Sequence, residues 1–568
     1  MIQVTLRRRA ALGSAMLVLL AVACGGGSGR SGFAEDDLAG DPAQSQDPTE
    51  GTSGSFGGGG PQTGVRLEPK NTTIVIDTAT NPATPAQLTY KALFKDSGVD
   101  KDVTAGSSFT LRDAAFGSFA GATFTSVAKL PGTALGVSTI VEARTPNGNA
   151  LGSLTIVQLR KTGAQRDFFF VVPYNEPPTP QSDVLTFSTN IKQVDVAFAM
   201  DTTASMSGAI NNLKSALSGT LMSQLQAAIP NVGLSVVDYK DYPVGDYGSG
   251  SDFPVKVRQV ITTNLSQAQS AVSGYAASGG NDGPESQIPA MQHILTGEAL
   301  TWSGGSVPKH TPAAGMWGGV DFRPGSVPVI VNITDINWHG ENNTPYNFTT
   351  PTMASLKAAF AAKNAFFVNV TSGSEAQADE LSDATNSNLP PAAFAGTAGC
   401  AAGQCCTNTN GAGRAPTGPG GRCRLNFKHS NGSGVSTAVA KAIEAIAVGS
   451  TFDVKAIPSN DPANAKGVDA TKFIKALRAK DEGDAANGCP AHPAKDSDGD
   501  GVKDTFLAVK VGTPVCFEVI PQTNTTVPPE QIAQFYNAFV DVIGVQGNVK
   551  LDRRTVLFLV PPTDPGVK

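Results

Sequence analysis

Three oxygen-bearing side chains, Asp201, Thr203 and Ser205, stand at every second position near the middle of the 568-residue chain. An apolar run of strand length, Val194–Met200, precedes them, and apolar residues then recur at three- and four-residue steps over 210–229. This pattern predicts a buried strand followed by one helix. Open α/β sheets bind ligands at such a turn, at the carboxyl end of a strand. Because carboxylate and hydroxyl oxygens are hard donors, the turn suits Mg²⁺, Mn²⁺ or Ca²⁺.

Taken alone, this spacing fits equally well an N-cap or Asx turn that opens a helix. Two other stretches favour a metal site. Val327–Asp335 is a second apolar run that ends in an acid, and Ser278–Glu285 is a turn-rich loop with two acids that precedes another helical pattern. Strands alternating with helices predict a mostly parallel sheet with helices on both faces.

Along the chain, the three stretches come in the family order of the metal-ion-dependent adhesion site of von Willebrand factor A domains, and they resemble that site. The family pattern is Asp-x-Ser-x-Ser, and Thr203 replaces its first Ser while keeping the hydroxyl. The Asp-x-Pro-Glu that ends at Glu285 and the His339 that follows Thr334-Asp335 are closer to integrin β-subunit I-like domains. The resemblance implies a doubly wound α/β von Willebrand factor A domain over 192–449.

In that family the hydroxyls touch the metal, the acids hold it partly through water, and a partner's acidic side chain fills an open position. Carried onto this chain, the resemblance implies that Thr203 and Ser205 are direct ligands. Asp201 and Asp335 would then bind directly or through water. Glu285 would be the ligand from the middle loop, or it could instead cap the helix that follows.

Other polar residues near these stretches have weaker assignments. Asp282 is the reserve for the ligand from the middle loop. The acids that follow the motif in integrins are replaced by Ser207-Gly208, so one flanking metal is expected to be missing. Asp238 and Asp241 are either part of an adjacent metal site or, more simply, solvated carboxylates at a strand end. A lone His339 is more often a structural neighbour than a general base.

The composition excludes some functions and leaves others open. With a net charge of −6 and no dense Lys/Arg patch, nucleic acid is not expected as a partner. The chain has no Gly-x-Ser-x-Gly, no His-Glu-x-x-His and no P-loop, and its five histidines are scattered. We therefore predict that the protein is not an enzyme. Its length suits about three or four domains.

The first 23 residues have the pattern of a signal peptide, with three arginines before an apolar run too short to span a bilayer. Small residues then lead into Cys24, which resembles the acylated cysteine of a bacterial lipoprotein, although Ala21 stands where that signal prefers Leu. Ordinary cleavage to a soluble protein is the alternative. Residues 24–64 predict a flexible linker. We expect an exported cell-envelope protein, an outer-membrane lipoprotein facing the periplasm or the surface, held at the membrane by its N-terminal lipid.

Short β-like runs flank the central region on both sides. Seven of them over 65–175 predict an all-β immunoglobulin-like sandwich. The chain returns to strand patterning over 450–568, which predicts a second sandwich-like domain. By analogy with integrin β subunits, the run at 184–190 is expected to pair with this C-terminal region. The expected fold is therefore multidomain, with a central α/β domain between all-β domains.

An acidic loop at 496–504 lies within the C-terminal region. Asp496, Asp498 and Asp500 alternate ahead of Gly501, a spacing that wraps oxygens around Ca²⁺ in EF-hand loops. The bidentate acid of the twelfth position is absent, so Asp504 would have to complete a structural Ca²⁺ site. An acidic turn without metal is the alternative.

Six cysteines remain when Cys24 is set aside, an even number in an exported chain. Three disulfides are therefore expected. We predict one between Cys489 and Cys516 and two within an insertion at 400–423, whose pairing the sequence leaves open. The four cysteines of the insertion are Cys400, Cys405, Cys406 and Cys423.

Together these features predict a cell-envelope adhesion protein. It would bind a protein or other macromolecular partner that offers a carboxylate, through Mg²⁺ (or Mn²⁺ or Ca²⁺) at the adhesion site. An envelope assembly scaffold with a purely structural metal is the alternative, and an enzyme is the least favoured class.

Overall fold

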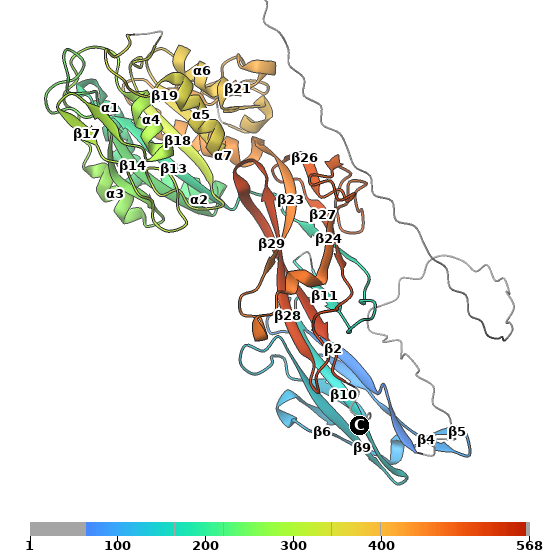
Figure 1. The fold of residues 1–568 in the computed structure, drawn as a ribbon. Helices are drawn as coiled ribbons and strands as arrows, with labels where there is room; N and C mark the ends of the chain where they lie inside the picture. The colour runs from blue at the N-terminus through green and yellow to red at the C-terminus, as the bar shows by residue number, and fades with distance from the viewer. Residues whose placement is uncertain (1–63, 164, 220, 342–343, 398, 564–568) are drawn as a thin grey trace, which may run out of the picture. The chain divides into compact units, whose positions relative to one another are not determined.

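The computed structural model describes residues 64–563 except 164, 220, 342–343 and 398 (Figure 1). The predicted signal peptide, Cys24 and the linker up to residue 63 lie outside the described residues. All described residues belong to one unit, Gly51–Lys568, which is multidomain and rich in β-sheet. In the described part of the chain, no helix is both long and apolar enough to span a membrane.

A six-stranded sheet forms the centre of residues 193–449, in the order β15-β14-β13-β18-β19-β22. All neighbours are parallel except β15, which runs antiparallel to β14. This order is doubly wound, because the chain starts at β13, builds outward in one direction and then returns to β18 to build in the other. The strands are β13 (Gln193–Asp201), β14 (Asn231–Tyr239), β15 (Lys256–Thr262), β18 (Val327–Thr334), β19 (Phe366–Thr371) and β22 (Asn426–Lys428).

Helices cover both faces of this sheet. Alternate residues of β13 belong to different cores: Phe198 packs with α1, α2, α3 and α7, whereas Ala199 packs with α4, α5 and α6. A strand buried on both faces is apolar throughout, which is why its sequence does not alternate. The helices are α1 (Ser207–Ser218), α2 (Leu221–Ala228), α3 (Leu265–Ser273), α4 (Gln287–Thr296), α5 (Met353–Lys363), α6 (Ala376–Ala384) and α7 (Val435–Gly449).

The single helix predicted over 210–229 is two helices. The apolar period does continue, and Leu213, Leu217, Leu221 and Leu225 are all buried in one core. The backbone breaks at Gly219, whose φ of −108° and ψ of −114° are not helical. Periodicity therefore predicted the buried face, and the glycine, with its wider choice of backbone angles, divided the helix.

Three small sheets form the N-terminal part, around a core that includes Tyr90, Phe109 and Phe124. The chain crosses from one of these sheets to another at Tyr90, which separates the strands at 87–89 and 91–96. The sheets are β2-β10-β9-β6 (Asn71–Asp77, Gly148–Leu159, Gly136–Thr145, Ser108–Leu111), β1-β4-β5 (Val65–Glu68, Lys91–Asp96, Val99–Asp102) and β3-β8-β7 (Gln87–Thr89, Thr123–Ser126, Gly117–Ala120).

Two strands that precede the α/β region pair with strands that follow it. β11 (Phe168–Val171) runs parallel to β29 (Val549–Val560), and β12 (Asp183–Phe187) runs antiparallel to β27 (Val515–Pro521). The α/β region is therefore inserted between segments of one β structure, as the analogy for 184–190 suggested. The run at 167–172 differs from expectation, because it does not join the N-terminal strands.

Aromatic packing explains why β11 pairs with β29 and not with the N-terminal strands. Phe168 and Phe170 are fully buried, and their rings lie 6.3 Å from Phe187 and 5.8 Å from Phe558, respectively. Two sheets result, β11-β29-β28-β23-β26-β25 and β12-β27-β24. The remaining strands are β23 (Thr451–Asn460), β24 (Ile474–Ala479), β25 (Ala494–Lys495), β26 (Thr505–Lys510) and β28 (Gln534–Gly544).

The three predicted disulfides are confirmed. Cys489 bonds to Cys516, and the insertion holds two further bridges, Cys400–Cys406 and Cys405–Cys423. The structure thereby assigns the pairing that the sequence left open. Such bridges are typical of exported proteins, because the cytosol keeps thiols reduced.

Candidate metal centre

Asp201 is the last residue of β13. It lies at the carboxyl ends of β13 and β18, the two strands between which the order of the sheet switches from one side to the other. Its carboxylate is fully buried. Oδ1 accepts hydrogen bonds from the backbone N–H (2.9 Å) and hydroxyl (2.7 Å) of Thr203, and Oδ2 accepts one from the hydroxyl of Thr334 (2.8 Å). The first and third predicted stretches therefore meet at Asp201.

The middle stretch lies against the first. Ser278 N donates to Thr202 O (3.1 Å), and Ala204 N donates to Gly279 O (3.3 Å). The buried Lys240 ammonium, from the residue after β14, also donates to Thr202 O and to the Ser278 carbonyl. Backbone and side-chain contacts thus hold the two loops together.

The middle stretch also contacts the third. Glu285 N donates to Asn337 O (3.2 Å), and His339 N donates to Glu285 O (3.0 Å). All three predicted stretches therefore converge at one edge of the sheet, where the carboxyl ends of parallel strands lie together.

The predicted ligands differ in burial. Thr203 and Glu285 are buried, Asp335 is half-buried directly after β18, and Ser205 is exposed in a short 3₁₀ turn, Ala204–Met206. Asp201, Glu285 and Asp335 do not bring three carboxylate oxygens within 4.8 Å of one another. Asp282 belongs instead to a neighbouring group with Asp241 and His339, in which two carboxylate oxygens and a ring nitrogen lie within 4.8 Å of one another.

Negative charge at this edge is poorly compensated. Burial, together with Asp201, Asp241, Asp282 and Asp252, raises the pKa of Glu285 to about 10, and burial raises the pKa of Asp201 to about 6. Within the described residues, neither Glu285 Oε2 nor Asp252 Oδ1 has a hydrogen-bond partner. A buried carboxylate without a partner is costly unless a proton or a cation neutralises it.

The nearby lysine and arginine side chains do not supply the positive charge that would neutralise Glu285. Lys240 directs its ammonium at backbone carbonyls, and burial lowers its pKa. Arg258 is occupied by Asp238, with hydrogen bonds of 2.8 and 2.6 Å. Asp238 is therefore an ion-pair residue, and it does not join the group around Asp241.

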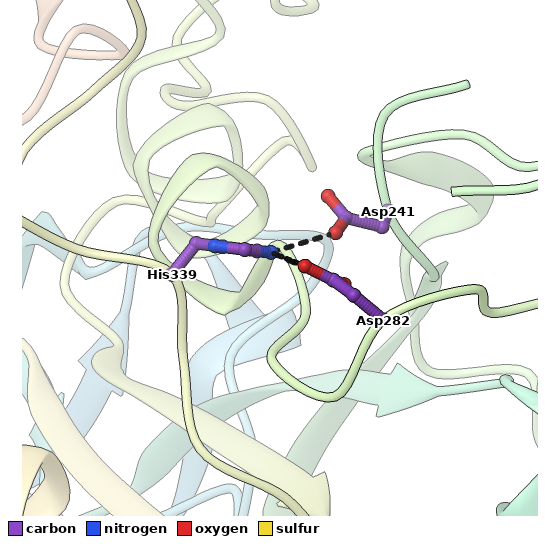
Figure 2. Close-up of side chains that lie close together, drawn as sticks. All are labelled: Asp241, Asp282 and His339. Carbon is purple, nitrogen blue, oxygen red and sulfur yellow. Dashed lines mark hydrogen bonds and ion pairs between the residues drawn. The ribbon is translucent and has the colours of Figure 1, made fainter. Parts of the chain in front are cut away.

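Figure 2 shows the ring of His339 directed at both Asp241 and Asp282. Its Nε2 is 3.1 Å from Asp241 Oδ2 and 3.2 Å from Asp282 Oδ2. Burial lowers the pKa of His339, but Asp241, the Thr344 carbonyl and Asp282 outweigh that effect and raise it. From the sequence, both acids were weak candidates and His339 was not a predicted ligand, because residues so far apart in the chain have no spacing that shows their contact.

The acidic loop of the C-terminal region is arranged differently from the predicted Ca²⁺ site. Asp496, Asp498 and Asp500 place carboxylate oxygens within 4.8 Å of one another. Asp504 is not in this group: its Oδ2 is 2.8 Å from Lys455 Nζ and accepts from Ser497 Oγ at 2.9 Å. Asp504 directly precedes β26 and is buried, and its carboxylate serves an ion pair with Lys455.

Comparison with known proteins identifies no family for this chain. No family model matches, and no curated protein matches. Among solved structures, the pilus adhesin SpaC from Lactobacillus rhamnosus GG, in its open conformation, aligns at 10% identity and a TM-score of 0.25, covering 67% of this chain and 46% of that one. Proximal thread matrix protein 1 from the mussel byssus aligns at 8% identity and a TM-score of 0.25, covering 46% and 48%. This chain spans less than half of either structure, and neither likeness assigns it a function.

Proposed function

We propose that this protein binds a macromolecular partner through a divalent cation held at Asp201. One observation carries the proposal: Glu285 buries a carboxylate oxygen without a partner on the loop that lies against Thr202–Ala204. A metal ion would supply the positive charge that this edge of the sheet lacks. Bound there, it would neutralise Asp201 and Glu285 together.

The donor set suits Mg²⁺, with Mn²⁺ or Ca²⁺ as the alternatives, because every candidate ligand is an oxygen. Thr203 and Ser205 would supply hydroxyls, and Asp335 a further carboxylate from the end of β18. Ser205 is exposed, so the turn is accessible to a partner's carboxylate. The strand order and the meeting of the three stretches support our assignment of residues 192–449 as a von Willebrand factor A domain of the integrin β type.

We propose a cell-envelope location, with Cys24 as a lipid anchor. The three disulfides support export. The expected partner is a protein or another macromolecule with an accessible carboxylate, and no enzymatic activity is proposed.

Capture from envelope extracts tests this function directly. The full chain is immobilised in Mg²⁺ or in chelator, beside Asp201→Ala and a matched acid-to-alanine control, Glu444→Ala, which changes an acid on α7 that pairs with Lys441. A partner should be retained by wild type and Glu444→Ala in Mg²⁺, and lost in chelator and in Asp201→Ala. Circular dichroism and intact disulfides verify folding.

The alternative function predicts a different pattern. If the metal only stiffens an assembly scaffold, the partner stays bound when the metal is removed. Retention in chelator by a folded protein would therefore overturn the adhesion proposal, and it would favour the scaffold.

A further inference from the structure

We propose that Asp241, Asp282 and His339 form a second cation site, which takes a first-row transition ion of the Zn²⁺ class. The three side chains come from separate segments: the loop after β14, the loop before α4 and the loop after β18 (Figure 2). This site does not depend on the proposed function of Asp201, whose own hydrogen-bond partners are Thr203 and Thr334.

The hydrogen bond of His339 Nδ1 determines which ring nitrogen can bind a metal. Nδ1 lies within hydrogen-bond distance of the Thr344 carbonyl. A carbonyl only accepts, so Nδ1 carries the proton, and in the neutral ring Nε2 keeps its lone pair. That lone pair faces two carboxylates. Histidine ligands in metal sites are commonly oriented by such a bond from the other ring nitrogen.

The spacing of the three donor atoms suits one shared ion. Metal–ligand bonds of about 2.1 Å place neighbouring ligands about 3.0 Å apart at a right angle and about 3.4 Å apart in a tetrahedron. His339 Nε2 lies 3.1 Å from Asp241 Oδ2 and 3.2 Å from Asp282 Oδ2. Both distances fall within that interval.

Asp241 is oriented for coordination by its surroundings. Its Oδ1 accepts from the Tyr242 backbone N–H (2.7 Å) and from the Tyr346 hydroxyl. Its Oδ2 is fully buried, points at His339, and receives no hydrogen bond of proper geometry. This oxygen is therefore available to coordinate an ion shared with His339 Nε2 and Asp282.

The donors and their shell select the metal. An imidazole nitrogen with carboxylates suits zinc and similar ions better than Mg²⁺ or Ca²⁺, which prefer oxygen alone. Aromatic rings pack beside the imidazole, Tyr346 at 4.3 Å and Tyr247 edge-on at 5.2 Å between centroids. The side chain of Asp282 is 30% exposed, which leaves an entry path from solvent.

Zinc binding by the full chain tests the proposal. Titration calorimetry is run on wild type, His339→Gln, Asp201→Ala and a matched control, His310→Gln, which removes an imidazole paired with one acid only, Asp321 at 2.7 Å. We expect His339→Gln to weaken zinc binding by more than about 100-fold, since even second-shell changes cost about 10- to 100-fold. His310→Gln and Asp201→Ala should bind zinc as wild type does.

X-ray absorption at the zinc edge, on wild type loaded with one equivalent, gives a readout that does not depend on how a variant folds. We expect one imidazole nitrogen and carboxylate oxygens in the first shell. A first shell without imidazole, or wild-type zinc affinity in His339→Gln, would overturn the site. Loss of zinc binding in a folded Asp201→Ala would also overturn it, by moving the zinc to the Asp201 centre. Loss of partner capture in Asp201→Ala with zinc retained separates this test from that of the proposed function.

Discussion

Two groups of acids in this molecule have similar composition and opposite chemistry. In the C-terminal loop, Asp496 accepts three backbone N–H bonds, from Asp498, Gly499 and Gly501, at 3.2, 2.7 and 2.9 Å. These bonds, led by those from Gly501 and Gly499, lower its pKa. At the edge of the α/β sheet, burial and neighbouring acids raise the pKa of Glu285 and Asp201 instead.

The difference lies in the hydrogen-bond donors that each local structure supplies to its carboxylates. An exposed turn offers its own amides and water to a carboxylate, and its amides lower the pKa of Asp496. A buried edge where strands end brings acids from distant segments together without enough donors. Sequence spacing was most regular at the C-terminal loop, yet the uncompensated charge lies at the sheet edge. Uncompensated carboxylate therefore follows burial more closely than it follows spacing.

The largest expected effect is on the pH dependence of stability without metal. The folded-state pKa of Glu285, about 10, exceeds its ordinary value of 4.5, so between these pH values the folded protein retains a proton that the unfolded chain has released. The contribution of Glu285 to stability is then greatest at low pH and falls as pH rises, by up to about 1.4 kcal/mol per pH unit. Asp201 adds to the fall between 3.8 and about 6.

Tryptophan fluorescence can follow this loss selectively, because all three tryptophans, Trp302, Trp317 and Trp338, belong to the α/β region. Urea unfolding is measured in chelator from pH 5 to pH 8. Glu285→Gln should flatten the profile, whereas Asp498→Asn should leave it unchanged. Equal slopes in wild type and Glu285→Gln would contradict the burial argument.

A smaller effect is expected from adding metal. At a Mg²⁺ concentration of 100 times its dissociation constant, the α/β region should gain about 2.7 kcal/mol of stability. Asp201→Ala should lose this gain, and Asp498→Ala should keep it. Thermal unfolding followed by the same fluorescence gives the measurement; a gain that survives in Asp201→Ala would place the ion elsewhere.

The smallest effects compare two acids of the C-terminal loop. Asp504→Asn breaks the ion pair with Lys455 and weakens the contact with Ser497, and it should cost about 1–2 kcal/mol. Asp498→Asn, whose side chain is 56% exposed, should change stability by less than about 0.5 kcal/mol. Urea unfolding followed by far-UV circular dichroism compares them in chelator. Equal costs would show that Asp504 belongs functionally to the exposed loop.

Local pattern predicted a large part of the fold. The apolar runs at 194–200 and 327–334 are buried strands, and the C-terminal region is rich in strands as its pattern predicted, although β24 and β25 were not predicted. Cysteine parity predicted three disulfides, and the cluster at 400–423 predicted two of them. These features depend on neighbours in sequence, which is why pattern reveals them.

Other features depend on partners that the sequence does not show. The strand at 168–171 joins β29 because its phenylalanines pack with Phe187 and Phe558, and no local signal marks that choice. Asp504 likewise pairs with Lys455 and does not join the acidic loop, because Lys455 is a partner from a distant part of the chain.

The amino-acid sequence by itself determined which segments are buried strands, which residues carry oxygen donors, and that the three donor stretches follow one another along the chain. Only the tertiary structure decided how the donors are grouped, placing Asp282 with Asp241 and His339 and leaving Glu285 beside the Asp201 loop. The physical reason is that burial and charge are properties of the assembled sheet edge, where segments far apart in the chain share one volume with few hydrogen-bond donors.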